Sequence, residues 1–229
     1  MKTMILLSGG IDSSVCLALA VKKYSNENVL ALNVFYGQRH SKEIEAAKNI
    51  ANFYSVRILT LDLSKLFIGC KSCSLLVGET ENNISTGSYN EQMKKSAIPD
   101  TYVPFRNGVF LSLAASIAIS NSCDKICYGA HLDDVMNASV YPDCSSFFYS
   151  TFSEAIYVGS GGMLSVLAPF INKSKSHIVH EGLKFNVPFK LTWSCYAGRE
   201  KACGKCATCL DRKLAFASNG VEDPIEYEQ

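Results

Sequence analysis

The sequence has almost no excess of charge of either sign and no long apolar run. Its 229 residues include 22 Lys and Arg against 21 Asp and Glu, which gives a formal net charge of +1. This balance provides no overall field for holding nucleic acid or an anionic membrane surface, so we expect no stable nucleic-acid binding. No apolar stretch approaches the roughly 18 residues that a membrane span needs, and the richest stretch, at residues 111–119, contains two serines. These absences favour a soluble protein.

The amino terminus also lacks the pattern of an export signal. The apolar run at residues 4–7 is too short for the hydrophobic region of a secretory signal, and it leads directly into a glycine turn. We therefore expect a cytoplasmic protein whose ten cysteines are mostly reduced. In such a protein, a cluster of cysteines indicates a metal or catalytic site sooner than a disulfide framework.

Predicted strands and helices alternate along the chain. Apolar runs predict strands, and apolar residues at helical spacing predict helices. The predicted strands cover residues 3–7, 29–35, 56–61, 125–129 and 165–169, and the predicted helices cover residues 12–24, 40–54, 107–121, 174–185 and 207–218. This alternation predicts an α/β fold, with a Rossmann-like parallel sheet that carries helices on both faces.

Two parts of the chain interrupt the alternation. Residues 68–104 are rich in Ser, Asn, Gly and Thr and have little periodicity, so we expect a long loop over the mouth of the site. The cysteine-rich end predicts a small appended unit. We expect an ATP-binding catalytic domain at residues 1–190 and a metal-binding segment at residues 191–229 that packs on it.

A glycine turn follows the first predicted strand. The turn, SGGIDSS at residues 8–14, leads into a helix, where free backbone amides and the positive end of the helix dipole attract an anion. No GK[ST] follows, which argues against a Walker A loop, and no GxGxxG is present, which argues against a dinucleotide site. A plain turn in which Asp12 or Ser13 caps the helix is the alternative. The position after the first strand favours phosphate binding.

Four cysteines near the carboxyl terminus have metal-ligand spacing. Cys203, Cys206 and Cys209 form CxxCxxC, and Cys195 lies eight residues before them. Four thiolates suit a tetrahedral zinc ion, and a site closed by four protein ligands is structural. An iron–sulfur cluster is the main alternative, and a disulfide or unrelated buried cysteines is the third.

The other cysteines give weaker signals. Cys16, Cys123 and Cys127 are interpreted as small buried apolar residues. Cys70 and Cys73 form a second CxxC with no companions at ligand spacing, so their role stays open.

The SGGIDS motif resembles the signature of the N-type ATP pyrophosphatases, or PP-loop proteins. In that superfamily the loop holds the pyrophosphate that departs when a substrate oxygen attacks the α-phosphorus of ATP. The resemblance implies ATP as co-substrate and Mg²⁺ as helper, with Asp12 as its ligand. The residues implied to hold the nucleotide are Leu7, Ser8, Gly9, Gly10, Ile11, Asp12, Ser13, Ser14, Val15, Cys16, Leu17, Arg106 and Asn107.

Further motifs narrow the resemblance to one family. These are YGQRH at residues 36–40, YVPFRN at 102–107, YPDC at 141–144, LTWSCY at 191–196 and GVEDP at 220–224. Together with the loop and the cysteines they resemble the 7-cyano-7-deazaguanine synthase (QueC) family. The resemblance implies an adenine-nucleotide alpha-hydrolase-like fold, a zinc-bound C-terminal segment and a homodimer. It also implies conversion of 7-carboxy-7-deazaguanine, ATP and ammonia to the nitrile, through two adenylations, for queuosine or archaeosine synthesis.

The resemblance also implies roles for individual residues. The implied catalytic residues are Ser8, Asp12, Ser13, Arg106 and Lys173, and the implied substrate-binding residues are Tyr141, Asp143, His131 and Asp134. Arg106, at the start of a helix, suits a carboxylate substrate, and Asp143 can accept hydrogen bonds from a guanine-like edge. The plainer alternatives are a solvated Lys173, a turn at Asp143 and an ordinary loop histidine at His131.

The sequence also departs from the family pattern. Phe105 stands where Ala or Gly is commoner, Ser145 stands where Arg is usual, and residues 129–141 form a longer stretch. Three other functions therefore stay open. They are a tRNA thiolase, which Cys70 and Cys73 would suit, a paralogue that acts with a protein partner in a defence system, and a non-catalytic zinc-stabilised binding module. No glutaminase segment is recognisable, so we expect ammonia from solution or from a separate protein.

Overall fold

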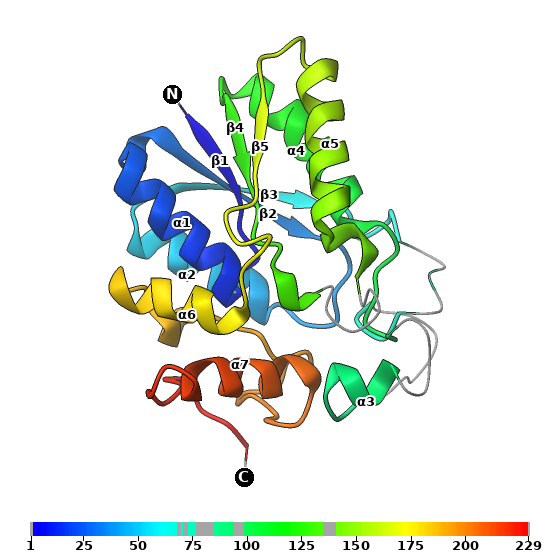
Figure 1. The fold of residues 1–229 in the computed structure, drawn as a ribbon, viewed down its shortest axis with the longest axis vertical. Helices are drawn as coiled ribbons and strands as arrows, with labels where there is room; N and C mark the ends of the chain where they lie inside the picture. Colours follow the sequence, from blue (N-terminus) through cyan, green and yellow to red (C-terminus); the bar gives the residue numbers. More distant parts are fainter. Residues whose placement is uncertain are drawn as a thin grey trace.

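A computed structural model describes residues 2–67, 70, 73–76, 85–93, 99–134 and 141–228. Within these residues, parallel strands form one five-stranded sheet in the order β3-β2-β1-β4-β5 (Figure 1). The strands are β1 (Thr3–Leu6), β2 (Val29–Phe35), β3 (Arg57–Asp62), β4 (Lys125–Cys127) and β5 (Ser165–Leu167). The predicted parallel sheet is confirmed.

Helices cover the sheet on both sides. They are α1 (Ile11–Tyr24), α2 (Lys42–Phe53), α3 (Tyr89–Met93), α4 (Arg106–Ser120), α5 (Ser146–Gly159), α6 (Lys175–Lys184) and α7 (Ala207–Ala217). The short 3-10 helices are η1 (Asn26–Asn28), η2 (Leu132–Asp134), η3 (Pro142–Cys144) and η4 (Phe189–Leu191). No helix of the described chain is both long and apolar enough to cross a membrane.

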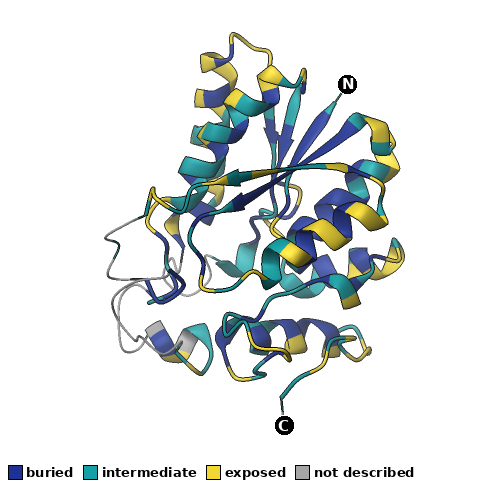
Figure 2. Ribbon diagram, turned by 180° about the vertical axis from the view of Figure 1, so that it is seen from behind, coloured by how far each residue is buried: buried dark blue, intermediate teal, exposed yellow. Residues whose placement is uncertain are grey.

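The side-chain alternation of the central strand divides the core into two layers. Met4 belongs to the layer that contains residues of α4 and α5, whereas Ile5 and Leu7 belong to the layer that contains residues of α1, α2 and α6. Figure 2 shows the buried sides of these helices turned toward the sheet. Because both faces are covered, β2 is buried along almost its whole length and is apolar except at Asn33, which fits the buried strand that residues 29–35 predicted.

The strand order reverses its direction of growth between β1 and β4. The chain leaves β1 through α1 on one face, whereas α4 and α5, which flank β4 in the sequence, lie on the other face. At such a switch point a crevice opens at the carboxyl ends of the strands, and ligands bind there. The SGGIDS turn lies at this point.

The sequence did not predict α5. Its segment, SFFYSTFSEAIYVG, is rich in aromatic and β-branched residues, which favour strands over helices. The helix nevertheless begins at a capping residue, since the Ser145 hydroxyl accepts a hydrogen bond from the Phe148 amide at 3.0 Å. Of the predicted long loop at residues 68–104, the structure describes residues 70, 73–76, 85–93 and 99–104, and this part contains α3.

The carboxyl-terminal segment contributes to two clusters of buried residues. Ala215 and Phe216 of α7 join the layer beside α1, and a separate small cluster gathers Cys195, Ala202 and two further cysteines. Figure 1 shows α7 next to α6, below the carboxyl ends of the strands. The division at residue 190 stays a prediction.

Candidate active site

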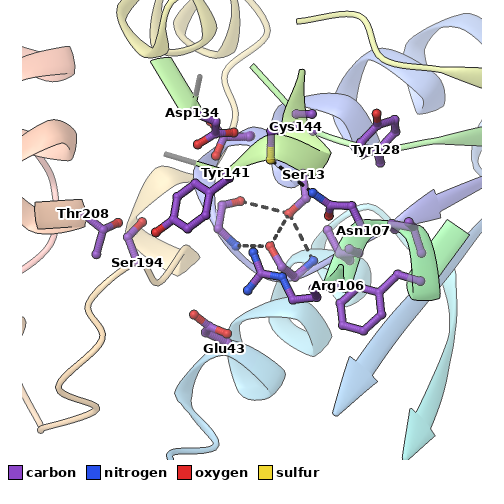
Figure 3. Close-up of a pocket in the computed structure, with 18 of the residues that line it drawn as sticks. Ser13, Glu43, Arg106, Asn107, Tyr128, Asp134, Tyr141, Cys144, Ser194 and Thr208 are labelled. Atoms are coloured by element: carbon purple, nitrogen blue, oxygen red, sulfur yellow. Dashed lines mark hydrogen bonds between the residues drawn. The ribbon is translucent and has the colours of Figure 1, made fainter. Parts of the chain in front are cut away.

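One pocket lies at the carboxyl ends of the strands, where the switch point predicts a ligand site (Figure 3). Three helices present their first turns to it, through Glu43 of α2, Arg106 of α4 and Lys175 of α6. The loops after β1 and β4 and the carboxyl-terminal segment complete its walls. Several positive helix ends and two cationic side chains in one pocket favour an anionic ligand.

The turn after β1 is held in shape by its serines. The Ser13 hydroxyl accepts a hydrogen bond from the Ser8 amide at 3.2 Å and lies 3.0 Å from the Ser8 hydroxyl. Ser8, Gly10, Asp12 and Ser13 line the pocket. This arrangement directs the amino end of α1 and two hydroxyl groups toward one space, as a phosphate site requires.

Two glycines allow the close packing around this turn. Gly9 has φ +87°, and a Cβ atom there would lie 2.5 Å from the carbonyl oxygen of Glu43. A Cβ atom at Gly129 would lie 3.0 Å from atoms of Asp12 and Ser13. The turn is therefore packed directly against α2 on one side and against the loop after β4 on the other.

The Asp12 carboxylate forms the centre of a charged cluster. Its Oδ2 atom accepts a hydrogen bond from Lys175 Nζ at 2.5 Å and lies 3.9 Å from His131 Nε2. His131 Nε2 also lies 3.5 Å from Asp134 Oδ1. Burial acts to raise the pKa of Asp12, but the charges of Lys175 and His131 outweigh it and lower that pKa. Asp12 is therefore ionised at neutral pH.

The structure brings Lys175, and not Lys173, into the pocket. Lys173 lies in the turn before α6, and its side chain is exposed and does not line the pocket. Lys175 is the first residue of α6, and its amide donates to the Asp133 carboxylate at 2.6 Å. The signal in the sequence was the capping serine at position 174, which directs the next residue into the first turn of the helix.

Arg106 is half-buried and lines the pocket away from this cluster. Its Nη1 atom donates to the Tyr36 hydroxyl at 3.3 Å, and its guanidinium lies 5.5 Å from the centre of the Tyr36 ring. Two carboxylates, Glu43 and Asp143, interact electrostatically with Arg106, and neither forms an ion pair with it among the described residues. Most of the donors of Arg106 are thus available to a ligand.

Asp143 lies outside the pocket lining and supports the start of α4, and its contact with substrate stays a prediction. It is buried and does not line the pocket, and its Oδ2 atom accepts a hydrogen bond from the Asn107 amide at 2.7 Å, which satisfies the first turn of α4. Asn107 Nδ2 donates to Cys144 Sγ at 3.1 Å. Cys144 lines the pocket in place of Asp143.

Tyrosine hydroxyls form a hydrogen-bonded network along one wall of the pocket. The Tyr141 hydroxyl oxygen lies 2.7 Å from that of Thr101, and the Tyr141 hydroxyl donates to the Tyr89 hydroxyl at 3.4 Å. The Tyr89 and Tyr196 hydroxyl oxygens lie 2.7 Å apart. Tyr141, His131 and Asp134 line the pocket, and the substrate-binding role that the resemblance implied for them stays a prediction. Burial raises the pKa of Tyr141, so the wall is neutral at physiological pH.

Not all residues of the predicted nucleotide set reach the pocket. Leu7, Ser8, Gly10, Asp12, Ser13, Arg106 and Asn107 line it. The side chains of Ile11, Val15, Cys16 and Leu17 are instead part of the core layer beneath α1, because the apolar face of that helix turns toward the sheet. Ser14 is buried and donates to the Gly10 carbonyl at 2.7 Å, and Gly9 packs against α2.

The four cysteines that the spacing singled out come together. Ligand atoms of Cys195, Cys203, Cys206 and Cys209 lie within 4.8 Å of one another, and they are the only such group among the described residues. The Cys203 and Ala197 amides donate to Cys195 Sγ at 3.2 and 3.4 Å. Together with hydrogen bonds from Cys206 and Cys209, these bonds hold the pKa of Cys195 well below its usual range. The group could bind a metal.

Residues beside the cysteines form part of the pocket. Ser194 and Tyr196 flank Cys195, Thr208 precedes Cys209 and Asp211 follows it by two residues, and all four line the pocket. Burial raises the pKa of Asp211. Sequence reasoning did not assign these residues to the site, because the sequence alone does not show that α7 lies under the strand ends.

A glycine and serine turn after the first strand of a five-stranded parallel sheet, with a lysine and an arginine in the same pocket, is the arrangement of a PP-loop protein. Among solved structures it is similar to the U34-tRNA thiolase NcsA from Methanococcus maripaludis with its [4Fe-4S] cluster. The TM-score is 0.51 at 18% identity over 82% of this chain and 58% of that one, which supports the fold alone.

The particular family follows from the sequence comparisons. The family described as "Queuosine biosynthesis protein QueC" matches residues 2–220, and the chain belongs to it. The chain is 42% identical over 226 residues to the 7-cyano-7-deazaguanine synthase of Archaeoglobus fulgidus, covering 98% of this chain and 90% of that protein. It is 40% identical over 228 residues to the synthase of Caldicellulosiruptor bescii, covering 100% and 98%.

Proposed function

We propose that this protein is an ATP-dependent 7-cyano-7-deazaguanine synthase. It converts 7-carboxy-7-deazaguanine and ammonia to the nitrile and releases AMP and pyrophosphate. The observation that carries this conclusion is the convergence of the SGGIDS turn, Lys175 and Arg106 on one pocket in a member of the QueC family. That pocket offers an anion site for the leaving pyrophosphate and a separate cation for the substrate carboxylate.

The first half of the reaction activates the acid. Arg106 orients the substrate carboxylate, one oxygen of which attacks the α-phosphorus of ATP, and the bond to pyrophosphate breaks. The Ser8 and Ser13 hydroxyls, the amides of the turn and the Lys175 ammonium stabilise the charge that develops on the departing pyrophosphate. The deazaguanine ring is placed at the end of the pocket where the Asn107 side chain donates a hydrogen bond to Cys144.

The second half replaces oxygen by nitrogen. Ammonia attacks the acyl carbon, the bond to AMP breaks, and the amide forms. A second ATP then activates the amide oxygen in the same pocket, and loss of AMP and two protons leaves the nitrile. One site serves both activations because each involves an oxygen on the same carbon atom of the substrate.

Asp12 has the properties expected of a magnesium ligand. Its Oδ2 atom is paired with Lys175, but its Oδ1 atom is buried and has no hydrogen-bond partner among the described residues. An orphaned, ionised carboxylate oxygen beside a phosphate site suits a hard cation. When bound there, Mg²⁺ would neutralise charge on the pyrophosphate oxygens.

The metal of the four-cysteine group is assigned as zinc with a structural role. Four thiolates at about 2.3 Å from the ion complete a tetrahedron and leave no position for a reactant. Metal analysis of the purified protein separates zinc from an iron–sulfur cluster, because only the cluster contains iron and absorbs visible light.

We also infer that the protein is a cytoplasmic homodimer. The ten cysteines are free in the structure, as a reducing compartment allows. The outer side of α5 exposes Phe147 (80% exposed), Tyr157 and Val158, and Phe105 packs beside it on Phe148 and Phe152. An exposed apolar face of this kind favours a second copy as partner. Light scattering of wild type and Phe147→Ser tests the assignment, and we expect the variant to shift toward monomer.

The experiment that tests the function is mass spectrometry of the small molecules after incubation with ATP, Mg²⁺, ammonium and 7-carboxy-7-deazaguanine. The nitrile, AMP and pyrophosphate should appear together. A folded, metal-loaded protein that forms neither nitrile nor amide would contradict the assignment and direct the search to a macromolecular acceptor.

A further inference from the structure

Glu43 is a carboxylate in the reaction pocket for which the mechanism above has no use. It belongs to the first turn of α2, and its side chain lines the pocket. The backbone of this turn is in direct contact with the phosphate loop, since a Cβ atom at Gly9 would lie 2.5 Å from the Glu43 carbonyl oxygen. Figure 3 shows the Glu43 carboxylate on the same side of the pocket as Arg106. Glu43 is therefore held near the site of bond formation.

Glu43 and Arg106 act on each other without direct contact. The charge of Arg106 opposes the effect of burial on Glu43, yet no ion pair or hydrogen bond joins the two side chains, and the Glu43 carboxylate has no hydrogen-bond partner among the described residues. Leaving opposite charges desolvated and separated is costly. The arrangement becomes favourable when reactants of complementary charge lie between them.

Arg106 and Glu43 suit different reactants, because their charges are opposite. Arg106 suits an anionic oxygen of the substrate or of ATP. The Glu43 carboxylate would repel both, and it suits a cation or an N–H donor of small size. Given the proposed function, on which this inference rests, the one co-substrate with those properties is ammonium.

We propose that Glu43 forms the ammonium-binding site of this enzyme and is the catalytic base of amide formation. The carboxylate holds the nitrogen against the activated acid by accepting hydrogen bonds from it. The bound ammonium first loses one proton, through Glu43, to solvent. The lone pair of the resulting ammonia then forms the C–N bond, and the C–O bond to AMP breaks with its electron pair leaving on the phosphate. One N–H proton passes to Glu43, so the acyl adenylate and ammonia yield the amide, AMP and a protonated Glu43, which returns its proton to solvent.

The environment of Glu43 suits proton transfer at neutral pH. Burial raises the pKa of Glu43 to about 7, against the opposing charge of Arg106. Tyr36, from the end of β2, is the other titratable group that interacts with it, and its own burial keeps it neutral by raising its pKa. The nearby Lys42 ammonium lies over the Trp193 ring, 5.5 Å from its centre. A base with a pKa near the working pH is the most effective one.

The test separates the two halves of the reaction in Glu43→Gln. The first half is measured as exchange of labelled pyrophosphate into ATP with 7-carboxy-7-deazaguanine and without ammonium. The second is measured as ammonium-dependent amide and nitrile formation. Glu45→Gln is the matched control, because Glu45 is exposed on the same helix and does not line the pocket. Thermal unfolding of each variant reports on folding, and Glu43→Asp replaces Glu43→Gln if the amide variant does not fold.

We expect Glu43→Gln to keep pyrophosphate exchange within about twofold and to lose about 100-fold or more of the ammonium-dependent rate, as loss of a general base does. Hydroxylamine, which is a neutral nucleophile at pH 7, should restore product formation as the hydroxamate. Glu45→Gln should match wild type. An unchanged ammonium-dependent rate in Glu43→Gln, or an equal loss of both halves, would overturn the role of Glu43. Absence of exchange in wild type would instead overturn the proposed function.

Discussion

The Lys175 ammonium donates a 2.5 Å hydrogen bond to the Asp12 carboxylate, a residue 163 positions away in the sequence. This contact ties the first turn of α6 to the first turn of α1 at the phosphate loop. The charge of Asp12 also outweighs burial and raises the pKa of Lys175, so the lysine stays cationic. A cation held at this point can stabilise the negative charge that develops on the departing pyrophosphate.

We predict that Lys175→Ala loses about 100-fold of the nitrile-forming rate, the size expected when one donor to a developing charge is removed. Lys173→Ala should match wild type, because Lys173 is exposed outside the pocket. Steady-state rates of the two variants at saturating ATP make the comparison. Equal activity of Lys175→Ala and Lys173→Ala would contradict the account of the site.

The carboxyl-terminal GVEDP motif has a structural explanation that leads to a second prediction. Arg212 of α7 is completely buried and donates to both oxygens of Asp223, at 2.7 and 2.9 Å. Removing one partner of a buried ion pair costs about 3–5 kcal/mol, so Arg212→Ala should lower the free energy of unfolding by that amount. The exposed pair of Arg199 and Glu228 provides the control, since Arg199→Ala should leave stability nearly unchanged. Urea unfolding of both variants measures the difference.

Removal of the metal should damage the pocket as well as the stability of the protein. Ser194 and Tyr196 flank Cys195, and Thr208 and Asp211 lie within two residues of Cys209, so a metal bound by the four cysteines would fix part of the pocket wall. We expect a chelator to lower the melting temperature and to weaken ATP binding, and we expect added zinc to restore both. Calorimetric titration with ATP checks this. ATP binding that survives complete metal loss would show that the segment does not shape the pocket.

Glu43 predicts a pH dependence of stability. Its pKa is about 7 in the folded protein, above the ordinary value of about 4.3 expected in the unfolded chain. Between these values the folded state binds more protons than the unfolded state, so the contribution of Glu43 to stability is complete at low pH and is lost as the pH rises through 7. Glu43→Gln should flatten this part of the profile. Identical slopes for wild type and variant in denaturant midpoints between pH 5 and 8 would contradict the assigned environment.

The sequence predicted the sheet, the turn after the first strand and the cysteine group, because each depends on residues that are close together in the chain. Apolar runs such as residues 29–35 predict buried strands directly, and the spacing of Cys203, Cys206 and Cys209 is itself a metal-ligand pattern. The pairing of Lys175 with Asp12 and the separation of Glu43 from Arg106 depend on how distant helices meet. No local pattern contains that information. The helix α5 was missed for a different reason, since its packing and its serine cap outweigh a strand-like composition.

In the proposed reaction a substrate oxygen attacks the α-phosphorus of ATP in both activations. Supplying 7-carboxy-7-deazaguanine with ¹⁸O in both carboxylate oxygens and following the label by mass spectrometry tests this step. We predict one ¹⁸O in each AMP, two AMP for every nitrile and no label in pyrophosphate. Label recovered in water or in inorganic phosphate, with unlabelled AMP, would contradict adenylation of the substrate.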